Sequence, residues 1–238
     1  MPPEDETVKV FNVDGIEFKM IKVNHGKFII GSPSTELGSL TIERPQHEVT
    51  ITNDYWIAET PVTQELWLKI TGKNPSVCKG DQNPVENISY IDAKDFITKL
   101  NEKTGENFRL PTEAEWEFAA RGGNESKGYI FPGSKTHKEV AWMKTNSDGK
   151  SHPVKQLKPN ELGIYDMGGN VAEWTNSKYV PYTAAAAVNP GTEAPAVNGN
   201  AVYRNGGYTD PAALIRCAYR YPAKTNYKLK TLGLRLAM

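Results

Sequence analysis

The sequence has little that would support thiolate chemistry, membrane insertion or electrostatic binding of nucleic acid. It contains two cysteines, Cys78 and Cys217, and neither belongs to a CxxC pair or lies near a histidine at zinc-ligand spacing. We therefore expect two free thiols or one bridge, and no structural zinc. The 28 basic and 28 acidic side chains cancel, which removes the global positive field that nucleic-acid binding needs. No apolar run reaches the roughly 18 residues of a membrane-spanning helix.

The composition is that of an ordinary globular protein. Of the 238 residues, 38% are hydrophobic and 24% are charged, with 20 glycines and 16 prolines. These values exclude a disordered chain, a collagen and a coiled coil, and they allow a full hydrophobic core. We expect a single domain over residues 1–238, with residues 1–7 as a flexible N-terminal segment.

Few segments have the periodicity and end signals of a helix. The segment Thr63–Ile70 has an N-cap residue at its start, and Gly72 follows it. A second helix is expected over Asp92–Lys103. A third is expected after Pro111, where Thr112 and Glu115 have the spacing of a capping box.

Strands are expected near the N-terminus. Phe18–Val23 and Lys27–Ile30 alternate or run apolar around an Asn-His-Gly turn, which predicts a hairpin, and His47–Thr52 predicts a further strand. After Gly122 the turn residues are so dense that little regular structure is expected. An exposed loop is expected from Tyr182–Val188 onward to residue 199.

Three motifs resemble those of the formylglycine-generating enzyme (sulfatase-modifying factor) domain family. They are RLPTEAEWEFAARGG at Arg109–Gly123, GIYDMGGNVAEWTN at Gly163–Asn176 and GLRL at Gly233–Leu236. Weaker matches occur at Glu59–Gln64 and Asn83–Ser89. The resemblance implies the C-type-lectin-like fold of that family, an α+β domain with few helices, short sheets and long loops.

The same resemblance speaks against thiol-based catalysis. Family enzymes carry a pair of copper-binding cysteines after a Gly-Gly motif, but Gly206–Arg216 contains no cysteine here, and Cys217 lies at the family's Arg-Cys-Ala position. A single thiol cannot form a two-sulfur copper site. The iron-dependent relatives need a histidine-rich site, whereas the histidines of this chain show no ligand spacing. A Ser-His-Asp arrangement stays open. The sequence therefore predicts that the chain is not an enzyme and requires no cofactor.

The C-terminal 38 residues differ from the rest of the chain. They hold five of the eleven tyrosines, seven basic residues and one acid, Asp210, for a formal charge of +6. Tyrosine and arginine are the side chains that dominate binding hot spots, which suggests a binding surface over about residues 203–235. The alternative is that the tyrosines belong to the core and the lysines to a solvated rim.

The tail also resembles the variable region of proteins diversified by diversity-generating retroelements, of the Treponema type. These proteins carry the same lectin-like fold, and their varied positions hold residues with NNC codons. The fixed framework would then include Arg204, Arg216, Arg220 and Arg235. The candidate varied, ligand-binding positions are Tyr208, Thr209, Asp210, Tyr219, Tyr221, Pro222, Ala223, Thr225, Asn226, Tyr227, Leu229 and Thr231.

The family resemblance further implies a structural calcium site in the loop from Gly163. Asp166 and Glu173 would supply carboxylates, and Gly169 and Val171 would supply carbonyls, an oxygen set suited to calcium. The alternative is that the same loop is held by hydrogen bonds without metal.

These observations lead to two hypotheses from different classes. The first is a non-catalytic, monomeric, receptor- or adhesin-like protein whose diversified surface binds a macromolecule, which we expect to be a protein. Such a protein would act at the cell surface, through an export signal or lipid anchor that this chain does not contain. The second is an oxidoreductase, or a degenerate enzyme, of the formylglycine-generating, sulfatase-modifying type.

Overall fold

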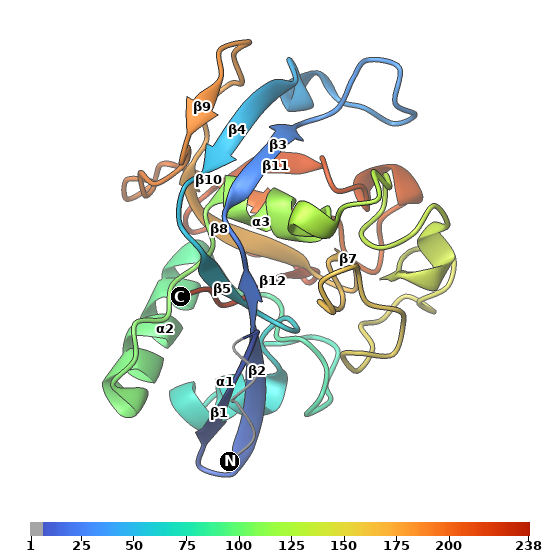
Figure 1. Cartoon of the computed structure of the whole chain (residues 1–238). Helices are drawn as coiled ribbons and strands as arrows, with labels where there is room; N and C mark the ends of the chain where they lie inside the picture. Colours follow the sequence, from blue (N-terminus) through green and yellow to red (C-terminus); the bar gives the residue numbers. More distant parts are fainter. Residues whose placement is uncertain (1–6) are drawn as a thin grey trace, which may run out of the picture.

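Helices α1 to α3 and strands β1 to β12 make up the regular structure of residues 7–238, the part of the chain that the computed structural model describes (Figure 1). The helices are α1 (Gln64–Thr71), α2 (Tyr90–Thr104) and α3 (Glu113–Ala120). The strands are β1 (Val8–Val13), β2 (Ile16–Val23), β3 (Gly26–Ile30), β4 (His47–Ile51), β5 (Tyr55–Ala58), β6 (Ala141–Trp142), β7 (Gly168–Gly169), β8 (Ala172–Lys178), β9 (Ala187–Val188), β10 (Asn200–Arg204), β11 (Arg220–Lys224) and β12 (Leu232–Leu234). Single 3₁₀ turns lie at Thr41–Glu43, Gly123–Glu125, His137–Glu139 and Ala212–Leu214.

Most of the segment expected to be flexible, residues 1–6, lies outside the described part of the chain. Thr7 is inside it, and its carbonyl accepts the Lys22 amide at 2.8 Å. Within residues 7–238, no helix is long and apolar enough to cross a membrane.

The three expected helices are present, because their end signals are local. The Thr63 side chain caps α1 by accepting the Leu66 amide, and Gly72 ends it with a left-handed conformation. Thr112 and Glu115 form the expected capping box of α3. Helix α2 begins two residues before the prediction, because Ser89 and Asp92 form a second capping box.

The expected hairpin at residues 18–30 is wrong. Strand β2 pairs with β1 and β5, whereas β3 pairs with β4, in a different sheet whose third strand is β9. Between β2 and β3, the backbone amide and ring Nδ1 of His25 both contact the Asp54 carboxylate, at 2.9 and 2.8 Å. This contact fixes the point where the chain passes from one sheet to the next. The periodicity identified the strands, but their partners lie far along the chain.

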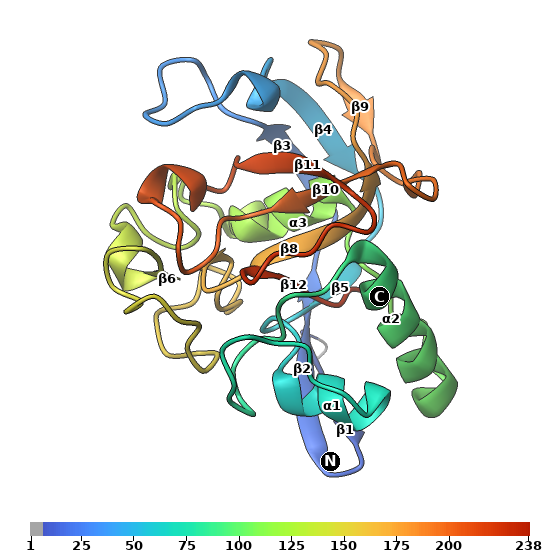
Figure 2. The same cartoon turned by 180° about the vertical axis from the view of Figure 1, so that it is seen from behind.

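Little of the chain after Gly122 is regular structure, as expected, but the sheet that its short strands form was not predicted. The second half forms a four-stranded sheet in the order β11-β10-β8-β12, in which β12 runs parallel to β8 and the other neighbours are antiparallel (Figure 2). Its strands are short and separated by turns, which is why turn residues dominated the pattern. The expected loop is exposed over residues 183–186 and then pairs with β4 as β9.

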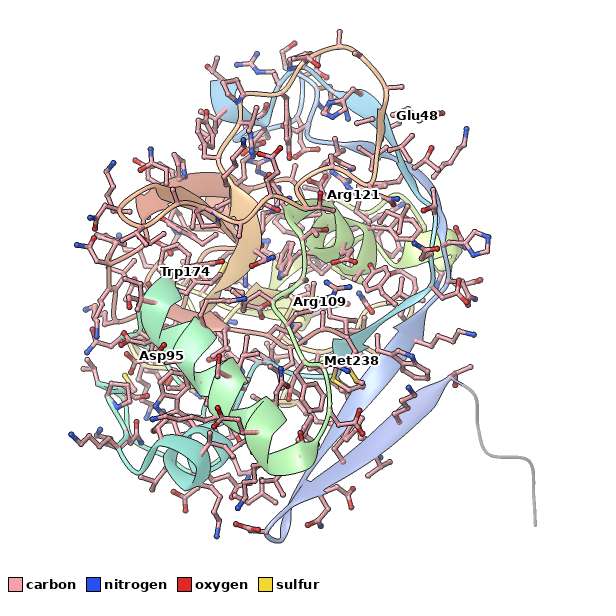
Figure 3. All side chains as sticks on the ribbon, turned by 90° about the vertical axis from the view of Figure 1, so that its left-hand side faces the viewer. Glu48, Asp95, Arg109, Arg121, Trp174 and Met238 are labelled. Atoms are coloured by element: carbon pink, nitrogen blue, oxygen red, sulfur yellow. The ribbon has the colours of Figure 1, made fainter. Side chains whose placement is uncertain are left out.

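The C-terminus is built into the core rather than appended to it. Ala237 exchanges backbone hydrogen bonds with Arg109, and Met238 does so with Trp56. Figure 3 shows Met238 next to Arg109, whose guanidinium donates to the Met238 carbonyl at 3.4 Å. Trp174 on β8 is fully buried and lies opposite Leu234 of β12. A tail with this many core contacts must keep a fixed framework, whatever its exposed positions do.

Candidate functional site

The β10–β11 hairpin separates its tyrosines from its arginines. Tyr203 lies opposite Tyr221 in the antiparallel pair, and Arg204 lies opposite Arg220. Because successive side chains of a strand point to opposite faces, the two tyrosines share one face of the sheet and the two arginines share the other. The contacts described below place α3 against the arginine face. The tyrosine face is therefore the one available for a ligand.

On the tyrosine face, aromatic rings form a continuous row from α2 to the surface. Tyr90 contacts Trp174 edge-on at 6.1 Å between ring centroids, Trp174 contacts Tyr203 at 5.9 Å, and Tyr203 contacts Tyr221 at 5.7 Å. Tyr90, Trp174 and Tyr203 are buried, whereas Tyr221 is 47% exposed. The buried rings hold the exposed ring in place, which reduces the entropy lost when it contacts a partner.

Two further tyrosines extend this cluster. The side chains of Tyr203 and Tyr219 interact with each other, and Tyr227, six residues after Tyr221, is 43% exposed. Burial raises the pKa of Tyr219 to about 12 and raises the pKa of Tyr203 as well. Both phenols are therefore protonated at neutral pH. We call Tyr203, Tyr219, Tyr221 and Tyr227 the tyrosine cluster.

Eight of the twelve predicted binding positions keep exposed or half-buried side chains. These are Thr209, Asp210, Tyr221, Pro222, Ala223, Asn226, Tyr227 and Leu229. The rims of the exposed region carry Lys224, Lys228 and Lys230, and Lys228 is paired with Asp92 at 2.7 Å.

The other four predicted positions, Tyr208, Tyr219, Thr225 and Thr231, are buried, with exposed fractions of 1–5%. The hydroxyl of Tyr208 contacts the Cys78 thiol at 3.4 Å, and the Thr225 hydroxyl accepts the Asn198 amide. In this conformation these four side chains contribute packing and offer almost no surface to a partner.

The arginines of the tail are buried and neutralised, which changes the meaning of the +6 charge. Arg204 contacts Glu113 at 2.9 Å and Glu117 at 2.6 Å, and Arg220 contacts Glu113 at 2.5 Å. Each of the remaining two arginines is also paired with buried or nearly buried glutamate. The interpretation of the tail as strongly basic is therefore wrong for its surface, where lysines alone carry the positive charge.

The predicted calcium ligands already have protein partners. The Glu173 carboxylate accepts hydrogen bonds from Trp116 Nε1 at 2.6 Å and from the Arg235 guanidinium at 2.9–3.2 Å. The amide of Asn205 donates to the carbonyls of Gly169 and Val171 at 2.9 and 3.0 Å.

The fourth predicted ligand, Asp166, accepts the Lys155 amide at 2.9 Å and lies 3.4 Å from the Asn170 side-chain nitrogen. Among residues 7–238, no three His, Cys, Asp or Glu side chains gather as a metal site would require. Arg235 and Asn205 supply the positive charge and the donors that a cation would supply, so this arrangement does not fit calcium.

We therefore expect calcium to leave the protein's thermal stability unchanged. If the loop bound calcium, a free calcium concentration of one hundred times the Kd would raise the free energy of unfolding by about 2.7 kcal/mol. The measurement is the unfolding temperature after EDTA treatment, with and without added calcium. A calcium-dependent rise would show that the loop rearranges to admit the ion.

The two cysteines are free and occupy different environments. Cys217 is fully buried, its sulfur lies 3.8 Å from the Ala120 carbonyl, and burial raises its thiol pKa to about 12. Cys78 is partly exposed beside the Tyr208 hydroxyl. Since a thiolate is the reactive form, Cys217 is inert at neutral pH.

A thiol titration tests this difference. With a chromogenic disulfide at pH 8, we expect one thiol, Cys78, to react in the folded protein and the second only after unfolding. The raised pKa of Cys217 keeps its sulfur protonated across this pH range. Rapid reaction of both thiols in the native state would contradict the burial of Cys217, and a Cys78→Ser variant identifies which thiol reacts.

Sequence reasoning missed the partners of the framework residues. Asn205 was not predicted to have a role, although its side chain joins β10 to the loop at Gly169. Glu113 and Glu117 were assigned only to a helix. One signal was present: a tail with four arginines and one acid needs carboxylates from elsewhere, and α3 carries glutamates spaced four residues apart on one face.

Together the sheet order, the few helices and the tyrosine cluster define a C-type-lectin-like α+β domain that presents an aromatic surface. Residues 12–238 match the model of the Sulfatase-modifying factor enzyme 1-like domain. The chain therefore belongs to that family.

Treponema denticola variable protein 1 has a similar structure, with a TM-score of 0.86 and 29% identity over 97% of this chain and 98% of that one. Chaperone protein LppX of Paenibacillus barcinonensis is 36% identical over 172 residues, which cover 51% of this chain and 61% of that protein. Formylglycine-generating enzyme of Mus musculus is 29% identical over 209 residues, 80% of this chain and 53% of the enzyme.

The family also includes inactive members. Inactive C-alpha-formylglycine-generating enzyme 2 of Bos taurus is 34% identical over 137 residues, 52% of this chain and 42% of that protein. The chain spans about half to three fifths of the length of the first curated relatives that it matches.

Proposed function

We propose that the chain is a non-catalytic ligand-binding protein, the variable protein of a diversity-generating retroelement, whose tyrosine face contacts a protein ligand. The observation that carries the proposal is the division of the β10–β11 hairpin into a tyrosine face, whose outer ring Tyr221 is exposed, and a buried arginine face. Such a division lets exposed side chains change while the ion-paired framework keeps the fold. The likeness to Treponema denticola variable protein 1 supports the same assignment.

The chemistry of the face favours a protein over a small molecule. Tyr221 and Tyr227 are the large exposed rings of the predicted positions, and Asn226, next to Tyr227 in the chain, and Thr209 are adaptable hydrogen-bonding side chains. This mixture is typical of antibody-like binding surfaces. Within residues 7–238, none of the twelve predicted positions lines the cavity of about 200 Å³ beside α1 or the cavity of about 460 Å³ beside α3.

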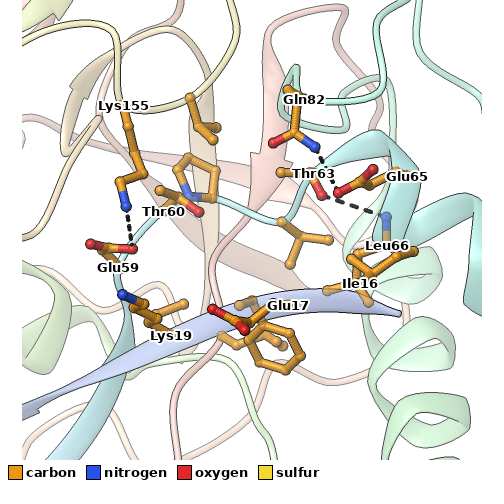
Figure 4. Close-up of a pocket in the computed structure, with 16 residues that line it drawn as sticks. Ile16, Glu17, Lys19, Glu59, Thr60, Thr63, Glu65, Leu66, Gln82 and Lys155 are labelled. Atoms are coloured by element: carbon orange, nitrogen blue, oxygen red, sulfur yellow. Dashed lines mark hydrogen bonds and ion pairs between the residues drawn. The ribbon is translucent and has the colours of Figure 1, made fainter. Parts of the chain in front are cut away.

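The smaller of these cavities does not suggest a second site. Its polar side chains pair with one another, Lys155 with Glu59 at 2.8 Å and Gln82 with Glu65 at 2.7 Å (Figure 4). With those groups satisfied and a volume of about 200 Å³, it lies below the usual size of a ligand pocket, about 300–1,000 Å³.

The alternative function is that of the formylglycine-generating enzymes. It has the support of family membership, but the cysteine pair is missing, and Cys217 is buried with a raised thiol pKa. Oxygen consumption by copper-treated protein with a cysteine-containing peptide distinguishes the two hypotheses, because the binding protein should show none above free copper. As a binding protein it would act at the cell surface.

A pair of display libraries tests the proposal. One library randomises Tyr221, Asn226 and Tyr227, and the other randomises the four buried predicted positions. Both are displayed on yeast and selected against a test protein such as lysozyme.

We expect the first library to stay folded in most clones and to give specific binders. We expect the second to lose folded display, because buried side chains are constrained by packing. Folded clones without any binders from the first library would contradict the binding role. Equal tolerance in both libraries would contradict the division into framework and face.

A further inference from the structure

A cavity of about 460 Å³ lies on the arginine side of the hairpin, away from the tyrosine cluster. It is bounded by β3 and β4, the start of α3 and the segment 178–193. Its volume falls within the range of small-molecule sites, about 300–1,000 Å³. Its apolar wall is formed by Ile30, Ala114, Val180, Pro181, Ala185, Ala186 and Ala187.

The charged side chains that reach this cavity are already paired. Glu113 binds Arg220 at 2.5 and 2.8 Å and accepts the Tyr182 hydroxyl at 3.0 Å. The Arg220 guanidinium also lies 3.9 Å from the centre of the Tyr182 ring. Lys178 and Glu193 form an ion pair with each other. The cavity therefore offers no free charge, and a charged ligand would lose its hydration without gaining a counter-ion.

The His47 imidazole, which lines the cavity, offers a polar group to a ligand. Nδ1 of His47 lies 3.3 Å from the Pro45 carbonyl, which can only accept, so Nδ1 carries the hydrogen. In the neutral ring Nε2 is then an acceptor, and it has no hydrogen-bond partner within residues 7–238. The His47 ring stands edge-on to Tyr182 at 5.0 Å. The cavity thus combines apolar walls, an aromatic side and one unused acceptor.

We propose that this cavity is a second binding site, for a small neutral aromatic molecule that carries an O–H or N–H donor, such as a phenol or an indole. The aromatic ring fills the space between the alanine-rich segment and Tyr182, and its donor binds Nε2 of His47. The site is separate from the tyrosine face, and it does not depend on the function proposed for that face.

Two probes and two variants test this site. The probes are 4-ethylphenol and its methyl ether, 4-ethylanisole, which share a ring and differ in the donor. His47→Phe keeps an aromatic ring and removes the acceptor, and Ala186→Trp fills the cavity from an exposed position. Binding is followed by amide chemical shifts in a titration, and the unfolding temperature of each variant confirms that it folds.

We expect saturable shifts at the residues that line the cavity, with the phenol binding about fivefold more tightly than the ether. His47→Phe should remove that preference while keeping the ether's affinity, and Ala186→Trp should abolish the binding of both. Absence of shifts at the lining residues up to the solubility limit would overturn the proposal. An unchanged preference in His47→Phe would overturn it as well. Neither result bears on the display libraries.

Discussion

Replacing Arg204 with methionine is expected to lower the free energy of unfolding by about 3–5 kcal/mol. Arg204 is fully buried and binds Glu117 at 2.6 Å, Glu113 at 2.9 Å and the Cys217 carbonyl at 2.6 Å. Methionine has a similar length but cannot donate. Its presence would leave Glu117 Oε2 without its ion-pair partner, while Arg121 still pairs with Oε1, and would leave the buried Cys217 carbonyl short of a donor. Urea unfolding followed by tryptophan fluorescence measures the loss.

The control for this variant removes the same charge from the same hairpin at the surface. Lys224 is the exposed last residue of β11, and Lys224→Met should change stability by less than about 0.5 kcal/mol. If both substitutions lowered the free energy of unfolding by equally small amounts, the ion pairs of the buried arginines would not be what stabilises the hairpin. The claim that framework and face are separate would then have no energetic basis.

Replacing Tyr208 with alanine is expected to lower the free energy of unfolding by about 3–5 kcal/mol, as for other buried large aromatic residues. Tyr208 is 1% exposed, and its carbonyl accepts the Ser147 hydroxyl at 2.7 Å. Its ring is part of the packing, so alanine leaves a cavity. The same change at Tyr221, which is 47% exposed, should cost less than about 1 kcal/mol.

This pair of tyrosine variants separates two roles that the sequence alone could not distinguish. Both residues are among the candidate varied positions, and both are tyrosines, a residue type that is enriched in binding hot spots. Comparable stability losses would contradict the assignment of Tyr208 to the framework and Tyr221 to the face. A loss at Tyr221 as large as at Tyr208 would show that the outer ring of the tyrosine cluster belongs to the core.

How far the fold could be predicted depended on the range of the interactions. Capping by Thr63 and the Thr112–Glu115 box act within three or four residues, so the helices could be located from sequence. The pairing of strands depends instead on contacts between residues that lie far apart in the sequence. The turn between β2 and β3 is fixed by Asp54, which lies 29 residues from His25, and nothing in the local pattern indicates that contact.

The same limit applies to the site. Composition pointed to the tail, at β10, β11 and the following turn, as the binding region. Which side chains reach the surface depends on distant contacts, such as that of Tyr208 with Cys78, 130 positions away. The predicted calcium loop is held by Asn205, which lies 36 positions from Gly169. The motif brings Gly169, Val171 and Glu173 together. The groups that bind them, the Asn205 side chain and the Arg235 guanidinium, come from positions farther along the chain.

The nucleotide sequence of the gene's 3′ end and its downstream flank tests the diversification of this surface most directly. The account predicts a near-repeat of the tail beside a reverse transcriptase gene, with differences confined to positions where the repeat has adenine. Those differences should fall in codons of exposed residues such as Tyr221, Asn226 and Tyr227, while the codons of Arg204 and Arg220 match. The absence of any such repeat, or differences spread equally over the buried arginines, would contradict it.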